Sequence, residues 1–223
     1  MLQEIQSSLF WEVMPYLLRG ALVTIEISLL SMLLALVLGL ITAVGRLSRM
    51  WLPRFLAGIY VEVVRGTPLL VQLFIVYYGL PSVGIMLDPF MAGFLTLGAH
   101  YGAYLSEVYR AGILAVDRGQ WEAAASIGMS RTMIMREIIL PQAFRTILPP
   151  IGNYFISMLK DSALVATISV TELLRAGQLR VAITFRAMDI YLMVAAMYLV
   201  MSYALSLLIR HLEKRSSQGV HLP

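Results

Sequence analysis

Three consecutive polar residues, Lys160, Asp161 and Ser162, are the side chains best placed to do chemistry in this sequence, because they interrupt a long apolar stretch. A charge inside a membrane-length apolar segment is energetically costly, so it normally pairs, faces a cavity or takes part in transport. An ammonium, a carboxylate and a hydroxyl supply the donors and the acceptor that a small zwitterion needs. Adjacent helix positions diverge by about 100 degrees, so the two charges cannot both face one point unaided. An ion pair between helices, or a place near the membrane surface, is the alternative explanation.

A second polar stretch runs from Arg65 to Gln72 with the sequence RGTPLLVQ. Its glycine and its proline both weaken a helix, and a break here would expose backbone groups to a cavity. Broken helices at binding sites recur in transporters. Arg65, Thr67 and Gln72 are therefore candidate ligands. An ion pair between Arg65 and Glu62, one turn earlier, is the competing interpretation of the arginine.

Three further polar residues precede Lys160 on the same segment: Asn153, Tyr154 and Ser157. They are weaker candidates, because single polar residues inside a membrane more often cross-link helices. His100 is interpreted as a packing residue, since no second histidine lies near enough in sequence to suggest a metal. The chain has no cysteine, no G-x-x-x-x-G-K glycine loop and no nucleophile elbow. We therefore expect no catalytic residue, no metal and no cofactor bound by this chain.

The composition is that of an integral membrane protein. Hydrophobic residues make up 59% of the 223 positions and charged residues only 13%, whereas soluble domains are about one quarter charged. The near-bilayer apolar runs leave no room for a separate soluble domain, so residues 1–223 are predicted to form a single transmembrane domain. The net charge of +4 is spread between apolar segments, which argues against a nucleic-acid partner and for a role in membrane topology.

Five apolar segments qualify, or nearly qualify, as membrane-spanning helices, which need roughly 20 residues each. They lie at about 22–44, 61–87, 89–113, 146–168 and 190–209. The predicted fold is therefore all-α, with five transmembrane helices around a central path.

The basic residues predict the orientation of these helices. Eleven fall in loops on one side and four on the other. The eleven are Arg46, Arg49, Arg54, Arg110, Arg118, Arg131, Arg136, Arg145, Arg210, Lys214 and Arg215; the four are Arg19, Arg175, Arg180 and Arg186. Because basic loops stay in the cytoplasm, we expect the N terminus outside and the C terminus inside. The first ten residues carry no basic side chain, so a cleaved signal peptide is not expected.

The loop at about 114–145 is far longer than a plain connection requires. Residues 120–127 favour a helix, with Glu122 in its first turn, where a carboxylate suits the positive end of the helix dipole. Gly128 can end that helix and Ser130 can begin a second one over 131–140. Pro141 disfavours extending the second helix without a kink. The loop is thus predicted to form a short, rigid helical hairpin.

This hairpin resembles the EAA loop of binding-protein-dependent ABC import permeases. The spacing is Glu122-Ala123-Ala124, three residues, Gly128, nine residues, Ile138, one residue, and Leu140-Pro141. An E-A-A triplet alone is merely good helix, but the full spacing is specific. The resemblance implies that the first short helix docks into a cleft on a cytoplasmic ATPase subunit and acts as a lever on the spanning helices.

The likeness extends over about residues 20–210 and is closest to the polar amino acid branch, which includes histidine, glutamine and cystine permeases. The matching stretches are 65–72, 103–104 with Glu107, 110–112, 119–120 and 159–164. The resemblance implies a type I, MetI-like permease fold in a bacterial cytoplasmic membrane. It also implies a second permease (another copy or a paralogue), two ABC ATPase subunits that use the ATP, and an extracytoplasmic amino-acid-binding protein. The alternative is a secondary amino acid carrier driven by an ion gradient, which buried charges would also permit.

Overall fold

The computed structural model describes residues 2–217, and every regular element in that range is helical. The α-helices are α1 (Leu2–Leu47), α2 (Trp51–Arg65), α3 (Leu69–Phe74), α4 (Pro89–Leu114), α5 (Arg118–Ser126), α6 (Arg131–Ile134), α7 (Leu140–Asp161), α8 (Leu173–Thr184) and α9 (Ala187–Ser217). Two π-helical turns (Ile75–Gly79 and Met135–Ile139) and two 3-10 segments (Leu80–Val83 and Ser162–Ile168) connect them.

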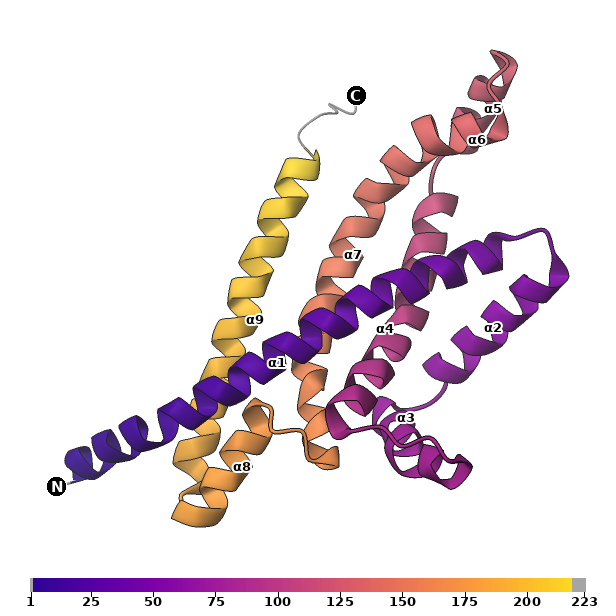
Figure 1. Cartoon of the computed structure of the whole chain (residues 1–223). Helices are drawn as coiled ribbons and strands as arrows, with labels where there is room; N and C mark the ends of the chain where they lie inside the picture. The colour runs from indigo at the N-terminus through magenta and orange to yellow at the C-terminus, as the bar shows by residue number, and fades with distance from the viewer. Residues whose placement is uncertain (1, 218–223) are drawn as a thin grey trace.

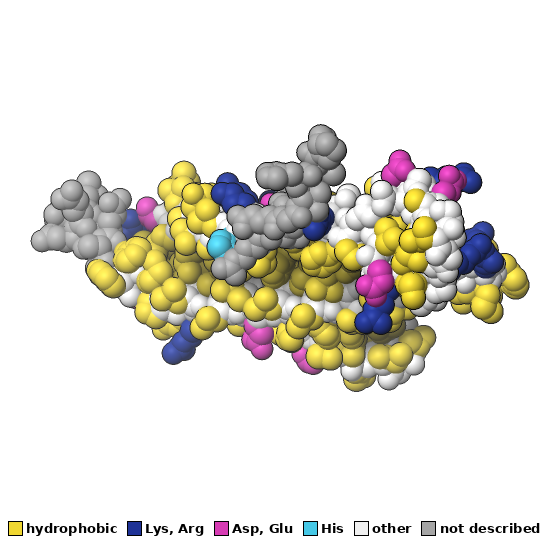
Figure 2. All heavy atoms as spheres, turned by 90° about the horizontal axis from the view of Figure 1, so that it is seen from above, with side chains coloured by type: hydrophobic (Ala, Val, Ile, Leu, Met, Phe, Trp, Pro, Cys, Tyr) yellow, Lys and Arg dark blue, Asp and Glu magenta, His cyan; other side chains and the backbone are white. Residues whose placement is uncertain are grey.

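The long helix α1 runs diagonally across the other helices (Figure 1). The N terminus, α3 and α8 lie at one end of the molecule, and α5, α6 and the last helical turns of α9 lie at the opposite end (Figure 1). Viewed from that second end, hydrophobic side chains follow much of the long flank of the molecule (Figure 2). This outline suits a protein whose sides face hydrocarbon and whose ends face water.

The contact between α1 and α4 is the most extensive in the fold. It depends on small residues, because a Cβ atom on Gly98 of α4 would lie only 2.5 Å from a methyl carbon of Leu34. On the other side, a Cβ on Gly39 of α1 would lie 2.9 Å from the Cβ of Leu105. Small residues let membrane helices approach closely, which raises the dispersion energy of the pair. Most of the main buried core lies along this contact.

Helix α1 is 46 residues long, or about 69 Å, roughly twice the thickness of the hydrocarbon core. Its N-terminal half leaves α4 and packs on α8 and α9 through Val13, Leu17, Leu173 and Ile190, all fully buried. The apolar stretch expected at 22–44 is therefore only the C-terminal half of the helix. The sequence before it contributes a second, smaller core.

Not every predicted span is apolar enough to be identified by composition. Among the described residues, Leu9–Leu47 and Ala187–Lys214 are long and apolar enough to cross a membrane, and the bent pair α2–α3 adds a third. Helices α4 and α7, of 26 and 22 residues, match the third and fourth predicted segments. They are more polar because neighbouring helices shield them: Thr96, His100 and Ser106 of α4 are buried inside the protein.

The second predicted segment, 61–87, is wrong as one continuous helix. Helix α2 already begins at Trp51 and ends at Arg65, and the chain then bends by 107° before the helix resumes at Leu69. The glycine and proline at 66 and 68 account for the break, because proline lacks an amide hydrogen and disfavours helical geometry in the residue before it.

Candidate functional site

The break between α2 and α3 is held together by the side chain of Gln72. Its Nε2 donates to the carbonyl of Val64 at 2.7 Å and to the hydroxyl of Thr67 at 2.8 Å, while its Oε1 lies 3.0 Å from Nδ1 of His100. Thr67 in turn donates to the carbonyl of Val63 at 2.9 Å. The predicted ligands Thr67 and Gln72 thus serve the backbone groups that the break exposes, and His100 is part of the same arrangement.

Arg65 lies at the end of α2 and is exposed. Its guanidinium carbon lies 5.3 Å from the centre of the Tyr104 ring, within the range of a cation–π contact. Within the part of the chain that the structure describes, Arg65 makes no ion pair, so the pairing with Glu62 is not seen. Its hydrogen-bond donors are therefore available to a ligand.

Arg65 borders a cavity of about 350 Å³ between α2, α4 and α7, here called the Arg65 cavity. Its polar lining residues are Arg65, Tyr104, Glu107, Thr146 and Tyr154. The Glu107 carboxylate is already bound by two arginines, Arg46 and Arg110, each at 2.8 Å. Three guanidinium groups around one carboxylate leave the region net positive, which favours an anionic group in the cavity.

An aromatic cluster joins this cavity to the polar residues at the end of α7. The rings of Tyr104 and Tyr154 are 5.6 Å apart, and those of Tyr154 and Tyr101 are 6.2 Å apart. The Tyr101 hydroxyl donates to Oδ2 of Asp161 at 2.6 Å. Tyr154 and Asp161, both predicted from the sequence, therefore belong to one connected set with Arg65.

Lys160, Asp161 and Ser162 do not act as one group. Asp161 ends α7 with its carboxylate on Tyr101, whereas Lys160 is exposed and makes no ion pair among the described residues. Ser162 is fully buried and donates to the carbonyl of Leu159 at 2.7 Å. This divergence is what adjacent helix positions predict. Upstream, Asn153 is exposed and Ser157 is half-buried.

The sequence-based candidates omitted Tyr101, Tyr104 and Glu107. All three lie on α4, at positions 101, 104 and 107, where a spacing of three places successive side chains near one face of a helix. The sequence signal for these three residues was therefore their spacing of three within a segment that was predicted from its apolar character. Nothing in the local sequence indicates that this face meets Arg65 and α7.

The α5–α6 hairpin, residues 118–134, is as compact as predicted. Gly128 adopts a left-handed conformation with φ of +82°, which a side chain would strain. Ser130 caps α6 by accepting from the amide of Met133 at 3.3 Å. Ala124 is buried against Ile134 and Ile139, whereas Ala123 is exposed. The two alanines therefore have different roles, one inside the hairpin and one on its surface.

Two details of the hairpin differ from the prediction. The first helix starts earlier, at Arg118, because Asp117 caps it by accepting from the amide of Gly119 at 2.6 Å. The second helix does not end at Leu140 but continues into α7 through a π-helical turn over Met135–Ile139. The wider turn ends two residues before Pro141 and accommodates its missing amide hydrogen. Movement of the hairpin is thus linked directly to α7.

Glu122 is exposed and pairs with Arg118 at 3.0 Å. The side chains of Ile138 and Leu140 lie along the π-turn and the start of α7, and Ile138 packs against the hairpin core. All residues of the predicted motif from Glu122 to Pro141 thus lie in the hairpin or in its junction with α7.

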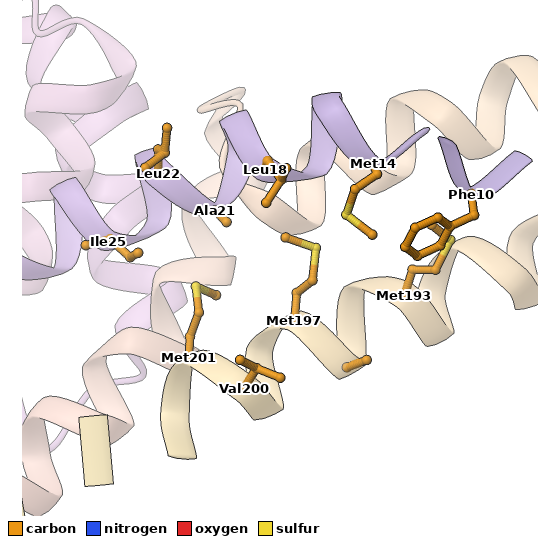
Figure 3. Close-up of a pocket in the computed structure, with 11 residues that line it drawn as sticks. Phe10, Met14, Leu18, Ala21, Leu22, Ile25, Met193, Met197, Val200 and Met201 are labelled. Atoms are coloured by element: carbon orange, nitrogen blue, oxygen red, sulfur yellow. The ribbon is translucent and has the colours of Figure 1, made fainter. Parts of the chain in front are cut away.

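An apolar cavity of about 680 Å³ lies between α1 and α9. Met14, Met193, Met197 and Met201 line it together with leucine, isoleucine, valine and phenylalanine side chains (Figure 3). It lacks ionisable side chains that could bind a polar ligand. We therefore place the candidate site at the smaller Arg65 cavity.

Comparison with known proteins identifies the class. An all-helical chain of this architecture is found in a crystal structure of an amino acid ABC transporter with histidines, with a TM-score of 0.89 and 40% identity over 92% of this chain and 96% of that chain. Inward-facing structures of the MetNI methionine ABC transporter share the fold at 18% identity, with a TM-score of 0.76 for one crystal form. The chain has the type I importer permease fold.

The sequence comparisons give the family. Residues 35–218 match the model of the binding-protein-dependent transport system inner membrane component, and the chain belongs to this family. It is 39% identical to the glutamine transport system permease protein GlnP of Escherichia coli K12, over 93% of this chain and 96% of that protein. It is 42% identical to the L-cystine transport system permease protein TcyB of Bacillus subtilis 168, over 95% and 89% of the two chains.

Proposed function

We propose that this chain is the membrane-embedded permease subunit of an ATP-driven importer of polar amino acids. The observation that carries the proposal is the α5–α6 hairpin, which combines the EAA spacing with a rigid turn at Gly128 and runs directly into α7. The named relatives, for glutamine and cystine, support the substrate class.

The Arg65 cavity is the proposed contact for the substrate. The Arg65 guanidinium suits the α-carboxylate, because arginine presents two parallel N–H donors to a carboxylate. The faces of Tyr104 and Tyr154 suit the ammonium group through cation–π attraction. Asp161, held by Tyr101 beyond the aromatic cluster, is the next acceptor for that ammonium. Arg65 would thus bind the carboxylate of a zwitterion, and Asp161, further along the path, would accept from its ammonium.

The same proposal assigns the partners. A second permease, either another copy or a paralogue, completes the path; two cytoplasmic ABC ATPase subunits bind and hydrolyse ATP; and an extracytoplasmic binding protein delivers the amino acid. This chain performs no covalent chemistry and holds no cofactor. The N terminus, α3 and α8 face outward, and the hairpin faces the cytoplasm.

The mechanism is alternating access. Closure of the ATPase dimer moves the α5–α6 hairpin, and the continuous helix from α6 through the π-turn carries that movement to α7. Because Asp161 ends α7 and Tyr154 lies on it, the same movement changes the geometry of the Arg65 cavity. ATP thereby shifts the population toward the outward-facing state.

Reconstitution tests the proposal. We expect uptake of radiolabelled glutamine or cystine into proteoliposomes only when the ATPase, the binding protein and ATP are present together. Uptake by the purified chain alone, driven by a proton or sodium gradient, would instead identify a secondary carrier.

A further inference from the structure

Four arginines lie at the end of the molecule that carries the N terminus and α8, on the side that has the fewest basic residues: Arg19, Arg175, Arg180 and Arg186. Two of them have partners. Arg175 donates to Oε1 of Gln178 at 3.4 Å, and Arg186 pairs with Asp189 at 2.8 Å. Neither Arg19 nor Arg180 makes an ion pair within the described part of the chain.

Arg19 and Arg180 meet at one site, although they are 161 positions apart in the sequence. They line a cavity of about 150 Å³ between α1 and α8, together with Tyr16. The Arg180 guanidinium lies 3.5 Å from the centre of the Tyr16 ring, which fixes its position by a close cation–π contact. Tyr16 thus holds one cation beside the other.

No acidic side chain lines this cavity. The nearest carboxylate along α8, Glu172, is fully buried and directed away from it, since it accepts from the Tyr198 hydroxyl at 2.6 Å and from two amides at the start of α8. Two guanidinium groups beside one cavity without an acidic lining residue make a site for an anion, and arginine binds the oxygens of a phosphate group through paired N–H donors.

The surroundings of the cavity are apolar. Leu18 and Leu22, next to Arg19 on α1, are 52% and 66% exposed, and Leu179 and Ile183, next to Arg180 on α8, are 42% and 63% exposed. Leu18 and Leu22 also line the apolar cavity of Figure 3, which extends the surface available to acyl chains. Tyr16 and Arg19 directly precede the apolar segment at about 22–44 of α1, and tyrosine beside arginine at the border of an apolar segment is typical of the headgroup level of a membrane.

We propose that this cavity binds the phosphate group of an anionic phospholipid, in the leaflet on the N-terminal side of the membrane. Arg19 and Arg180 contact the phosphate, and the exposed leucines of α1 and α8 contact the acyl chains. The apolar flanks favour a lipid over a free anion or a carboxylate of a soluble protein, because neither of those would cover them. This site is separate from the Arg65 cavity and does not depend on the identity of the transported amino acid.

The test is retention of phosphatidylglycerol by the full-length chain in detergent, followed by native mass spectrometry, with phosphatidylcholine as the neutral comparison. We expect the variant R19Q/R180Q to retain phosphatidylglycerol about 30-fold less tightly, or about fivefold for each arginine. The matched control R175Q/R186Q removes the same charge from the same end and should retain it nearly as well as the wild type.

A less disruptive substitution keeps the proposal testable if R19Q/R180Q does not fold. Tyr16→Leu keeps both charges but releases Arg180 from the ring, and should weaken retention about threefold. Unchanged retention in these variants, equal loss in the control, or equal retention of the two lipids contradicts the site. Two further outcomes overturn it. If the wild type binds inorganic phosphate as tightly as phosphatidylglycerol, the site is one for a free anion. If R19Q/R180Q retains the lipid normally but no longer captures the extracytoplasmic binding protein, the arginines bind a protein carboxylate.

Discussion

The α5–α6 hairpin and the Arg65 cavity are built in opposite ways. The hairpin depends on neighbours in sequence: Ser130 caps α6 by binding an amide three residues on, and Ala124 packs within the same loop of about thirty residues. The cavity depends on distant segments, since the bond from Tyr101 to Asp161 spans 60 positions and Arg65 reaches a ring on another helix. A site proposed for partner binding can thus be formed by residues close in sequence, whereas the proposed substrate site between helices forms only when the whole chain folds.

The largest expected effect concerns the hairpin. Gly128→Asp should reduce ATP-driven uptake at least tenfold, because a side chain at φ +82° strains the turn that sets the angle between α5 and α6. Gly84→Asp is the matched control: Gly84 has a φ of +84° and open space around it, but it lies in the loop between α3 and α4. Uptake and co-purification of the ATPase measure both. Equal loss of ATPase association in the two variants would show that the hairpin has no special role.

The next effect concerns the cavity. Arg65→Gln should raise the KM for uptake about tenfold to a hundredfold, since a hydrogen bond to a charged group contributes about 1.5–3 kcal/mol. Arg65→Lys should recover part of the loss, because lysine keeps the charge but not the paired donors. Glu62→Gln, on the same helix and equally exposed, is the control and should leave KM unchanged. A normal KM in Arg65→Gln would remove this residue from the substrate path.

A smaller effect tests the connection between the cavity and α7. Tyr101→Phe removes the hydroxyl that holds Asp161 and keeps the ring in the aromatic cluster. We expect a several-fold loss of uptake at wild-type levels of assembled complex. Tyr109→Phe, which removes a weaker bond of 3.4 Å to the carbonyl of Leu36, should have little effect. If both variants transport equally well, the link from Tyr101 to Asp161 does not serve transport.

The smallest effect is on stability. Glu122→Gln breaks an ion pair with Arg118 whose two side chains are 68% and 89% exposed, and such surface pairs contribute only about 0.3–0.5 kcal/mol. Thermal unfolding should shift little, while co-purification of the ATPase weakens. A large drop in the unfolding temperature would mean that Glu122 supports the hairpin itself and not its partner.

The same contrast explains what could be predicted from the sequence. The limits of α4 and the turn at Gly128 follow from local signals: Asp88 and Pro89 begin the helix, and glycine permits the left-handed conformation. The break after Arg65 was also readable, from a glycine and a proline. The bend of 107° that follows from the break was not predictable, since a hydropathy pattern does not indicate the direction in which the chain continues.

The site itself was only partly predictable. Gln72 was predicted as a candidate ligand, but its amide group binds the exposed backbone carbonyls and His100, which no sequence spacing indicates. Glu107 was named only in the family likeness and not among the candidate ligands, and its pairing with Arg46 of α1 could not be predicted from the sequence. Pairings across helices depend on packing, and packing is set by the whole fold.

Docking of the α5–α6 hairpin onto the ATPase subunit is the central claim, and a single cysteine tests it most directly, because the chain has no natural cysteine. Ala123→Cys places a thiol on the exposed face of α5, and Met86→Cys, at a position 83% exposed near the opposite end, is the control. We predict that the thiol at position 123 reacts with a bulky maleimide in the isolated permease and is protected in the complex with the ATPase, while the thiol at position 86 reacts equally in both. Equal labelling of position 123 with and without the ATPase would contradict the account.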